Sequence, residues 1–214
     1  TSLSWIGYES AGDISYDAFL DCPKLLFQPL GTNQLSYVLD ETGKRAMITG
    51  LVETSTSGSP ENVSGIYIPE MIDGVKVAGI SADAFEGNTV LRRVCLAESI
   101  EQIGKGAFAG CTLLEYVEMT CVTKIGADAF NGCSNLTPLL RDSLQEIGSG
   151  AFAGLNEETV SSIFVPKDTI VSWDAFEGYT GTIYTERDSK FAMAVTGGMY
   201  TVEYKEDSLR LITI

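Results

Sequence analysis

Between residues 84 and 176 an Ala-Phe pair recurs five times, and each phenylalanine follows a branched aliphatic residue by five positions. Successive phenylalanines are 23, 22, 22 and 24 residues apart. A fixed repeat of about 20–29 residues is typical of solenoids, in which each coil covers the apolar face of its neighbour. The spacing therefore predicts about five stacked coils, whose shared core holds the phenylalanines of the repeat: Phe85, Phe108, Phe130, Phe152 and Phe176.

Each repeat also carries a second apolar pattern, Leu-x-x-Val-x-Leu, after its Phe-x-Gly step. In an extended segment the fourth and sixth positions of this pattern lie on one side, toward the core. The two halves together predict an α+β solenoid, in which each coil has a short strand, a turn, an aliphatic-Gly step and a short helical turn at Ala-Phe. The inward strand positions in this register are Val94 and Leu96, then Val117 and Met119, then Leu139 and Arg141, and, in a divergent copy, Ile163 and Val165.

Arg141 is the exception in this register, because it stands where the other repeats have an aliphatic residue. Two explanations remain open. Either the strand frays and the arginine stem turns toward solvent, or the register slips by one residue in that coil.

The outward positions of the predicted strands are the candidate binding residues. Neighbouring strands lie about 5 Å apart, so their outward side chains merge into one surface. Tyrosine, arginine and exposed phenylalanine are typical of protein-contact hot spots, although an ordinary sheet surface is the alternative. The register places Arg93, Cys95, Tyr116, Glu118, Pro138, Leu140, Ser162 and Phe164 there, and the predicted binding face comprises Arg93, Tyr116, Glu118, Leu140, Ser162 and Phe164.

An aspartate directly precedes Ala-Phe in several copies of the motif. Stacked carboxylates could hold a cation, but Gly106 and Gly150 interrupt the series in alternate coils. Capping of a helical turn is the simpler interpretation. The aspartates concerned are Asp17, Asp83, Asp128 and Asp174.

The chain has five cysteines, so at least one is unpaired. Cys22, Cys111 and Cys133 share one place in the repeat, three residues after the phenylalanine. Asn88, Leu155 and Tyr179 take that place in other coils. A position that accepts Cys, Leu or Tyr is mainly a packing position, where cysteine acts as a small buried apolar residue. A disulfide between the cysteines of neighbouring coils is sterically conceivable but not required.

Charge and composition exclude several classes of function. The net charge of −15 would repel nucleic acid and anionic membranes. The chain lacks histidine, the most common general base and metal ligand. It also has no C-x-x-C pair and no D-x-D-x-D calcium loop. We therefore expect no catalytic residues, no metal site and no cofactor, while loose calcium binding by the acidic surface stays open.

The segments on either side of the repeats predict a four-part organisation. Residues 1–35 hold an orphan repeat-like segment or the end of a preceding block. Residues 36–79 form an N-terminal β cap, with a hairpin around an Asp-Glu-Thr-Gly turn, and residues 80–185 hold the repeats. Residues 186–214 form a C-terminal cap, with a short helix that begins at Asp188 or Ser189 and ends before Gly197, followed by a β-hairpin.

The motif Ile-Gly-x-x-Ala-Phe-x-Gly-Cys-x-x-Leu-x-x-Val resembles the BspA type of leucine-rich repeat, and the resemblance covers roughly residues 36–200. It implies a right-handed leucine-rich-repeat solenoid. Members of this family occur in surface and secreted proteins of bacteria and some mucosal protists, and they are associated with adhesion to host matrix, epithelium or other bacteria.

The resemblance and the composition together favour a non-enzymatic binding or adhesion module, bacterial, at the cell surface or secreted. Its expected partner is an extracellular protein or glycan, with no nucleic acid and no membrane span, and the chain is expected to be a monomer. No leader opens the sequence, so an exported protein would begin after a cleaved signal peptide or lie within a longer polypeptide. The alternative is a structural spacer, a repeat array within a larger surface protein that has no ligand of its own.

Overall fold

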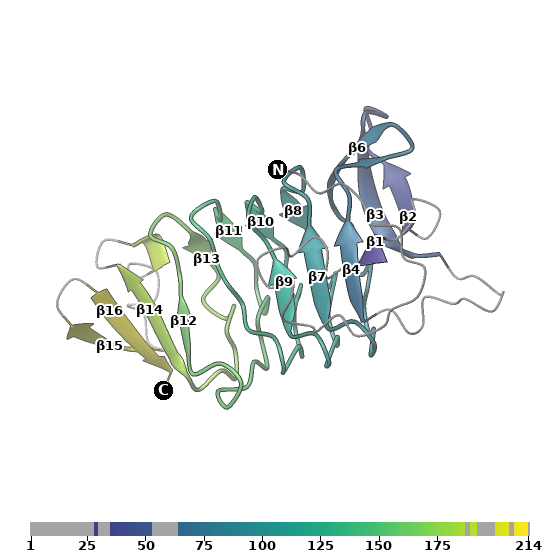
Figure 1. The fold of residues 1–214 in the computed structure, drawn as a ribbon. Helices are drawn as coiled ribbons and strands as arrows, with labels where there is room; N and C mark the ends of the chain where they lie inside the picture. The colour runs from purple at the N-terminus through teal and green to yellow at the C-terminus, as the bar shows by residue number, and fades with distance from the viewer. Residues whose placement is uncertain are drawn as a thin grey trace, which may run out of the picture.

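The computed structural model describes residues 28–29, 35–52, 64–186, 189–191, 200–205 and 208–213. These residues form an elongated stack of coils with strands along two sides (Figure 1). The strands are β1 (Gln28–Pro29), β2 (Leu35–Leu39), β3 (Arg45–Leu51), β4 (Gly65–Ile68), β5 (Met71–Ile72), β6 (Val75–Ile80), β7 (Arg93–Leu96), β8 (Gln102–Ile103), β9 (Tyr116–Glu118), β10 (Lys124–Ile125), β11 (Glu146–Ile147), β12 (Ser162–Phe164), β13 (Ile170–Val171), β14 (Thr182–Glu186), β15 (Tyr200–Lys205) and β16 (Ser208–Thr213).

Three sheets join the coils. Sheet A has the order β1-β4-β7-β9 and is parallel throughout. Sheet B runs β13-β11-β10-β8-β6-β3-β2, with β5 paired to β6, and contains the aliphatic-Gly steps of the repeat. Sheet C has the order β12-β14-β16-β15. Since successive coils stack with strands along two sides, although residues 137–141 form no strand, the predicted repeat solenoid is confirmed.

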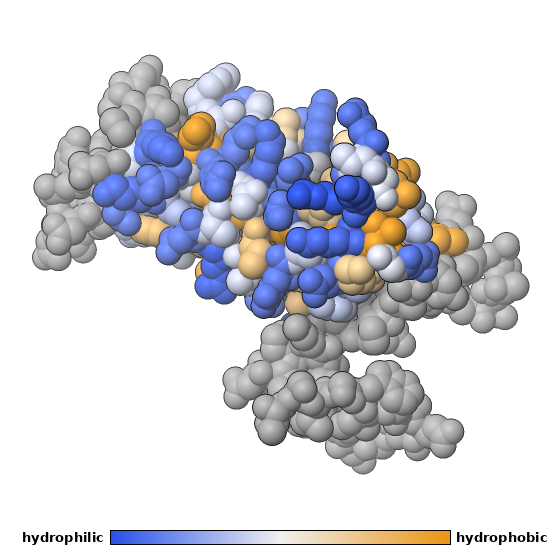
Figure 2. Space-filling view, turned by 90° about the horizontal axis from the view of Figure 1, so that it is seen from above, coloured by the Kyte–Doolittle hydropathy of each residue, from blue (hydrophilic) through white to orange (hydrophobic). Residues whose placement is uncertain are grey.

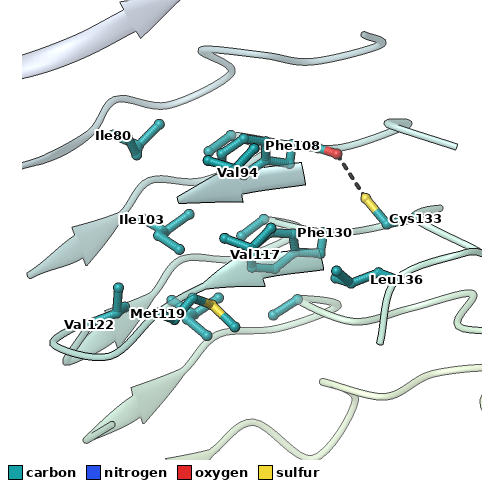
Figure 3. Close-up of a cluster of buried hydrophobic side chains, with 14 of the residues drawn as sticks. Ile80, Val94, Ile103, Phe108, Val117, Met119, Val122, Phe130, Cys133 and Leu136 are labelled. Carbon is teal, nitrogen blue, oxygen red and sulfur yellow. Dashed lines mark hydrogen bonds between the residues drawn. The ribbon is translucent and has the colours of Figure 1, made fainter. Parts of the chain in front are cut away.

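The core lies between the two sides of the stack. The phenylalanines of the five repeats stack ring on ring, with centroids 5.1 to 5.5 Å apart and planes within 10° of parallel. Figure 3 shows Phe108 and Phe130 beside Val94, Val117 and Ile103 of neighbouring strands. The series is continued by Phe191, whose ring lies 6.2 Å from that of Phe176 but is tilted by 58°.

The Ala-Phe segments are turns, and the helical turns predicted there are not found. The backbone explains the difference. The N–H of Phe85 donates to the carbonyl of Ala107 in the next coil at 2.7 Å, and the N–H of Phe108 donates to that of Ala129 at 2.8 Å. Because these donors pair between coils, they are not free for the within-segment bonds of an α-helix.

The aspartates before Ala-Phe have a conformational role in place of the predicted capping role. Asp83, Gly106, Asp128 and Gly150 occupy the same position in successive coils, with φ of 57°, 61°, 56° and 61°. Glycine and aspartate tolerate this left-handed region better than other residues, whereas an N-cap residue has extended backbone. Asp174 does not share the positive φ, and Asp17 lies outside the described residues.

The glycine of the aliphatic-Gly step is needed for another reason, the close approach of consecutive coils. A Cβ atom at Gly104 would lie 2.5 Å from the backbone nitrogen of Ala82, and one at Gly126 would lie 2.6 Å from that of Lys105. Both distances are well below van der Waals contact, so a side chain at this step would push the coils apart.

The register slips by one residue at 137–141, which is the second explanation offered for Arg141. These residues belong to the fourth coil, counted after the coils of β4, β7 and β9. Leu139, expected inside, is 45% exposed, and Leu140, expected on the outward face, is buried. The neighbouring coil shows why. Two consecutive N–H groups there, of Glu115 and Tyr116, donate to one carbonyl, but the residue equivalent to the second donor in the fourth coil is Pro138, which has no N–H.

At the N-terminal end, the predicted hairpin is confirmed. β2 and β3 pair antiparallel around a turn at residues 40–43, with a bulge between Ser36 and Tyr37. β4 pairs parallel with β7, and β6 pairs parallel with β8. The parallel stack therefore begins before residue 80, the predicted start of the repeats. The four-part division of the chain remains a prediction.

At the other end, β15 and β16 form the expected C-terminal hairpin and join β14 through β16. Of the expected closing helix, only residues 189–191 are described. Its two expected starts are Ser189, which is described, and Asp188, which is not, and its end before Gly197 lies outside the described residues. Most of the orphan segment at 1–35 also lies outside them, with Cys22.

Candidate binding surface

The outward side chains of sheet A fall into two rows set by the strand register. In one row Arg93 of β7 faces Tyr116 of β9, and in the other Tyr67, Cys95 and Glu118 are successive neighbours on β4, β7 and β9. Sheet A therefore brings together three of the six predicted binding residues: Arg93, Tyr116 and Glu118.

Hydrogen bonds hold the carboxylate of Glu118 in place on this surface. The hydroxyl of Thr120 donates to it at 3.1 Å, and the thiol of Cys95 contacts its other oxygen at 3.8 Å. Cys95, which the sequence placed on the outward face, is only 3% exposed. Its thiol lies beneath the surface as a support for the carboxylate.

Tyr116 lies at the junction of charges of both signs. Burial and the negative charge of Glu118 raise the pKa of Tyr116 above its usual value, and the positive charge of Arg141 opposes the rise. Arg141 is exposed and comes from the next coil. Arg92 and Glu115, which precede Arg93 and Tyr116 in the sequence, form an ion pair of 2.6 Å.

The remaining predicted residues have different outcomes. Ser162 is exposed and Phe164 is 48% exposed on β12, which begins sheet C beyond the fourth coil and lies on the same side of the stack as β9 (Figure 1). Leu140 is 8% exposed and packs in the core, so its assignment to the binding face is wrong. Leu139 and Arg141 replace it at the surface, and Pro138 was the signal in the sequence that could have revealed the slip.

The cysteines of the repeat pack inside the coils, as predicted. The thiol of Cys111 donates to the carbonyl of Phe85 in the preceding coil at 3.0 Å. The thiol of Cys133 donates to that of Phe108 at the same distance (Figure 3). Contact with the Cys111 thiol and burial raise the pKa of Cys133. The four described cysteines are free thiols, and Leu155 and Tyr179 occupy the same buried place in later coils.

The other surfaces of the described residues offer weaker candidates for a binding site. A shallow hollow of about 420 Å³ is lined by Glu157, Glu158, Ser161, Thr180, Gly181 and Thr182, and one of its carboxylates already accepts a hydrogen bond from Thr180 at 2.7 Å. Within the described ranges, no three acidic, cysteine or histidine side chains are grouped to hold a metal. No helix of the described residues is long and apolar enough to cross a membrane.

The side seen from above, along sheet B, is mostly hydrophilic, with apolar side chains gathered toward the β2–β3 end (Figure 2). Exposed apolar residues at that end are Val38, Leu39 and Met71. On sheet B itself, charged side chains pair across strands, as Lys124 and Glu146 do at 2.7 Å.

Comparison with known families decides what these coils are. The model of the BspA type leucine rich repeat region matches residues 61–181, with six copies of the repeat. The chain belongs to the BspA type leucine-rich-repeat family. BspA type repeats are repeat-based protein-interaction modules, and proteins of this kind are generally non-enzymatic.

Two solved bacterial structures share the repeat. A leucine-rich repeat protein of T. pallidum is 26% identical over 67% of this chain and 64% of its own length, with a TM-score of 0.59. A leucine-rich repeat protein of Bacteroides ovatus is 26% identical over 64% of this chain and 35% of its own length, with a TM-score of 0.55. The match thus spans less than two thirds of either relative. No curated protein matches the chain.

Proposed function

We propose that this BspA type repeat protein is a binding or adhesion module of the bacterial surface or the secreted fraction. It presents the outward face of sheet A, continued by β12, to an extracellular protein or glycan. The core of every coil follows the same pattern, whereas the outward residues differ from coil to coil. A surface of this kind combines several unlike side chains at one spacing and is suited to recognition.

The observation that carries the proposal is the exposure of large apolar side chains next to this polar cluster. Leu139 and Phe164 are 45% and 48% exposed on the side of the stack that holds Arg93, Tyr116 and Glu118. An aromatic and aliphatic pair beside tyrosine and arginine has the composition of protein-contact hot spots.

A binding screen tests the proposal. The whole chain is presented to matrix proteins, mucins and intact co-resident bacteria, next to a variant with Arg93, Tyr116, Glu118 and Phe164 all changed to alanine. The matched control carries Gln102→Ala and Lys105→Ala, away from sheet A. We expect bound ligand to be lost by the first variant and kept by the second. If the whole chain binds nothing in the screen, the spacer is the better description, and equal binding by all three proteins would exclude this face.

A further inference from the structure

The front of the stack, which is the side of sheets A and C, is interrupted at the fourth coil. Sheet A ends at β9 and sheet C begins at β12, and residues 137–141 between them form no strand (Figure 1). The backbone bonds on this side stop at Thr137, whose N–H donates to the carbonyl of Glu115 at 3.0 Å. Among the described residues, no backbone group of residues 138–141 is bonded to the third or the fifth coil.

The back of the stack, which is the side of sheet B, is continuous through the same coils. β10, β11 and β13 come from the third, fourth and fifth coils and pair in parallel without a gap. Just past these strands, the N–H of Gly148 donates to the carbonyl of Ile125 at 2.9 Å, and that of Ser172 donates to Ile147 at 3.0 Å. The three coils are therefore joined by an unbroken ladder of hydrogen bonds along the back but not along the front.

Two residues explain the interruption. Pro138 has no N–H, whereas Tyr116 at the same place in the third coil donates to the carbonyl of Arg92 at 3.1 Å. Arg141 takes the place of the buried Met119, and its side chain is exposed, because burial of an unpaired charge is costly. A continuous strand would need a donor at the first of these places and an apolar side chain at the second.

Apolar packing still holds the fourth coil in the stack. Leu136, Leu140 and Leu144 are buried in the common core. Apolar contacts are non-directional, whereas a hydrogen bond fixes both the distance and the angle between the groups it joins. A coil that is held by packing in front and by a ladder behind can therefore tilt at little cost, as packed elements do in shear motions.

We propose that the fourth coil is a hinge of the solenoid, at which the coils of sheet A and those of sheet C tilt relative to each other. The ladder of sheet B is the axis of this motion, and the front opens and closes at residues 137–141. Each part moves as a unit, because β4, β7 and β9 are paired with one another on one side of the hinge, and β12 is paired with β14 on the other.

The hinge divides the outward residues of the front between two plates, the strands of sheet A and those of sheet C. Arg93, Tyr116 and Glu118 lie on the first plate, and Ser162 and Phe164 lie on the second. Tilting changes the separation of the plates and leaves the spacing within each plate unchanged. Any partner that contacts both plates would select one angle, because a ligand shifts a conformational equilibrium toward the state that it binds better.

Residual dipolar couplings of the backbone amides test the hinge on the whole chain. These couplings are measured by NMR in a weakly aligning medium and report the orientation of each N–H bond in a common frame. We expect the couplings of residues 64–136 and those of residues 157–186 to require two alignment tensors of different magnitude. Residues 64–111 and 112–136 are the internal control and should fit one tensor. A single tensor for both sides of the fourth coil would overturn the hinge.

A repaired variant tests the cause of the motion. Pro138→Tyr, Leu140→Thr and Arg141→Met together give the fourth coil the alternation and the donor of β9, and circular dichroism checks that the variant is folded. We expect the two tensors to merge into one and the amides of residues 139–141 to exchange more slowly than in the native chain. Lys105→Ala, an exposed change away from the front, should keep two tensors.

The two measurements on the variant decide the case together. Two tensors that persist although the amides of residues 139–141 have become protected would refute the interruption as the origin of the motion. The comparison within the native chain stands by itself if the variant does not fold. Because the hinge is read from the ligand-free chain, its failure would leave the proposed binding function standing.

Discussion

The carboxylate of Asp83 lies directly over Gly106 of the next coil, so that a Cβ atom at residue 106 would collide with its Oδ1. Asp128 lies over Gly150 in the same way. The alternation of aspartate and glycine along the stack therefore has a steric cause. Each aspartate takes the space above the following coil, and both residue types accept the left-handed backbone.

This relationship predicts that the two positions can be exchanged only together. We expect Gly106→Asp to destabilise the fold by about 1–3 kcal/mol, because it adds a clash and a second carboxylate to a left-handed position. The double variant Asp83→Gly with Gly106→Asp removes the facing carboxylate and should recover part of the loss. Chemical denaturation of the two single variants and the double variant measures this coupling, and strictly additive effects would refute it.

The aromatic stack predicts a large effect of truncation. Phe108→Ala or Phe130→Ala should lower the free energy of unfolding by about 3–5 kcal/mol, because each ring is fully buried between two others. Phe164→Ala is the matched control, since its ring is 48% exposed, and we expect it to change stability by less than about 1 kcal/mol. Denaturation midpoints that fail to separate the buried from the exposed phenylalanines would contradict the assignment.

How far the sequence predicts this fold depends on the kind of information each position carries. The period of the phenylalanines, the β2–β3 hairpin and the buried place of Cys111 follow from pattern alone, because apolar spacing reports directly which side of a segment is buried. The conformation of Asp83 does not follow from pattern alone. An aspartate before a short turn is equally compatible with a helix cap and with a residue in the left-handed region.

The binding surface shows a second limit of prediction from the sequence. Aligning Leu139 with Val117 by spacing put the wrong leucine inside, because pattern matching ignores whether the backbone can pair. Pro138 removes one donor, the strand is not formed, and the coil turns its side chains by one position. The surface residues Leu139 and Arg141 were missed for that reason.

The unpaired segment should also be visible in amide hydrogen exchange. We expect the amides of Leu139, Leu140 and Arg141 to exchange faster than those of β7 and β9, because they lack partners within the described chain. Exchange followed by mass spectrometry or NMR on the ligand-free chain measures this difference. Equal protection in the fourth coil and in β9 would show that the sheet is continuous there.

Thiol reactivity should separate the cysteines by their position in the coil. Cys121 is partly exposed, whereas Cys111 and Cys133 are fully buried, and the raised pKa of Cys133 further lowers its thiolate fraction. We expect a maleimide to label Cys121 in the folded chain and the two buried cysteines only after unfolding. Peptide mapping identifies each site, and early labelling of Cys133 would argue against its packing role.

Tyr179 links stability to alkaline pH. Burial, aided by the charge of Glu157, raises its pKa to about 12, and its hydroxyl donates to the carbonyl of Val160 at 2.9 Å. Since an unfolded tyrosine ionises near pH 10, the folded state favours the protonated form. This contribution is present below about pH 10 and is lost as the pH rises toward about 12. The stability difference between the native chain and Tyr179→Phe should shrink over that range, and a constant difference would rule out the link.

The ring stack also determines how a protein of this kind can change its reach. The ring contacts of the five repeats recur at a step of 5.1 to 5.5 Å. Insertion or loss of one whole coil would therefore move the two ends of the stack by a single step and leave the row of rings continuous, whereas two coils would also preserve the alternation of aspartate and glycine. The distance between recognition residues on the front of the stack can thus change during evolution only by whole multiples of this step.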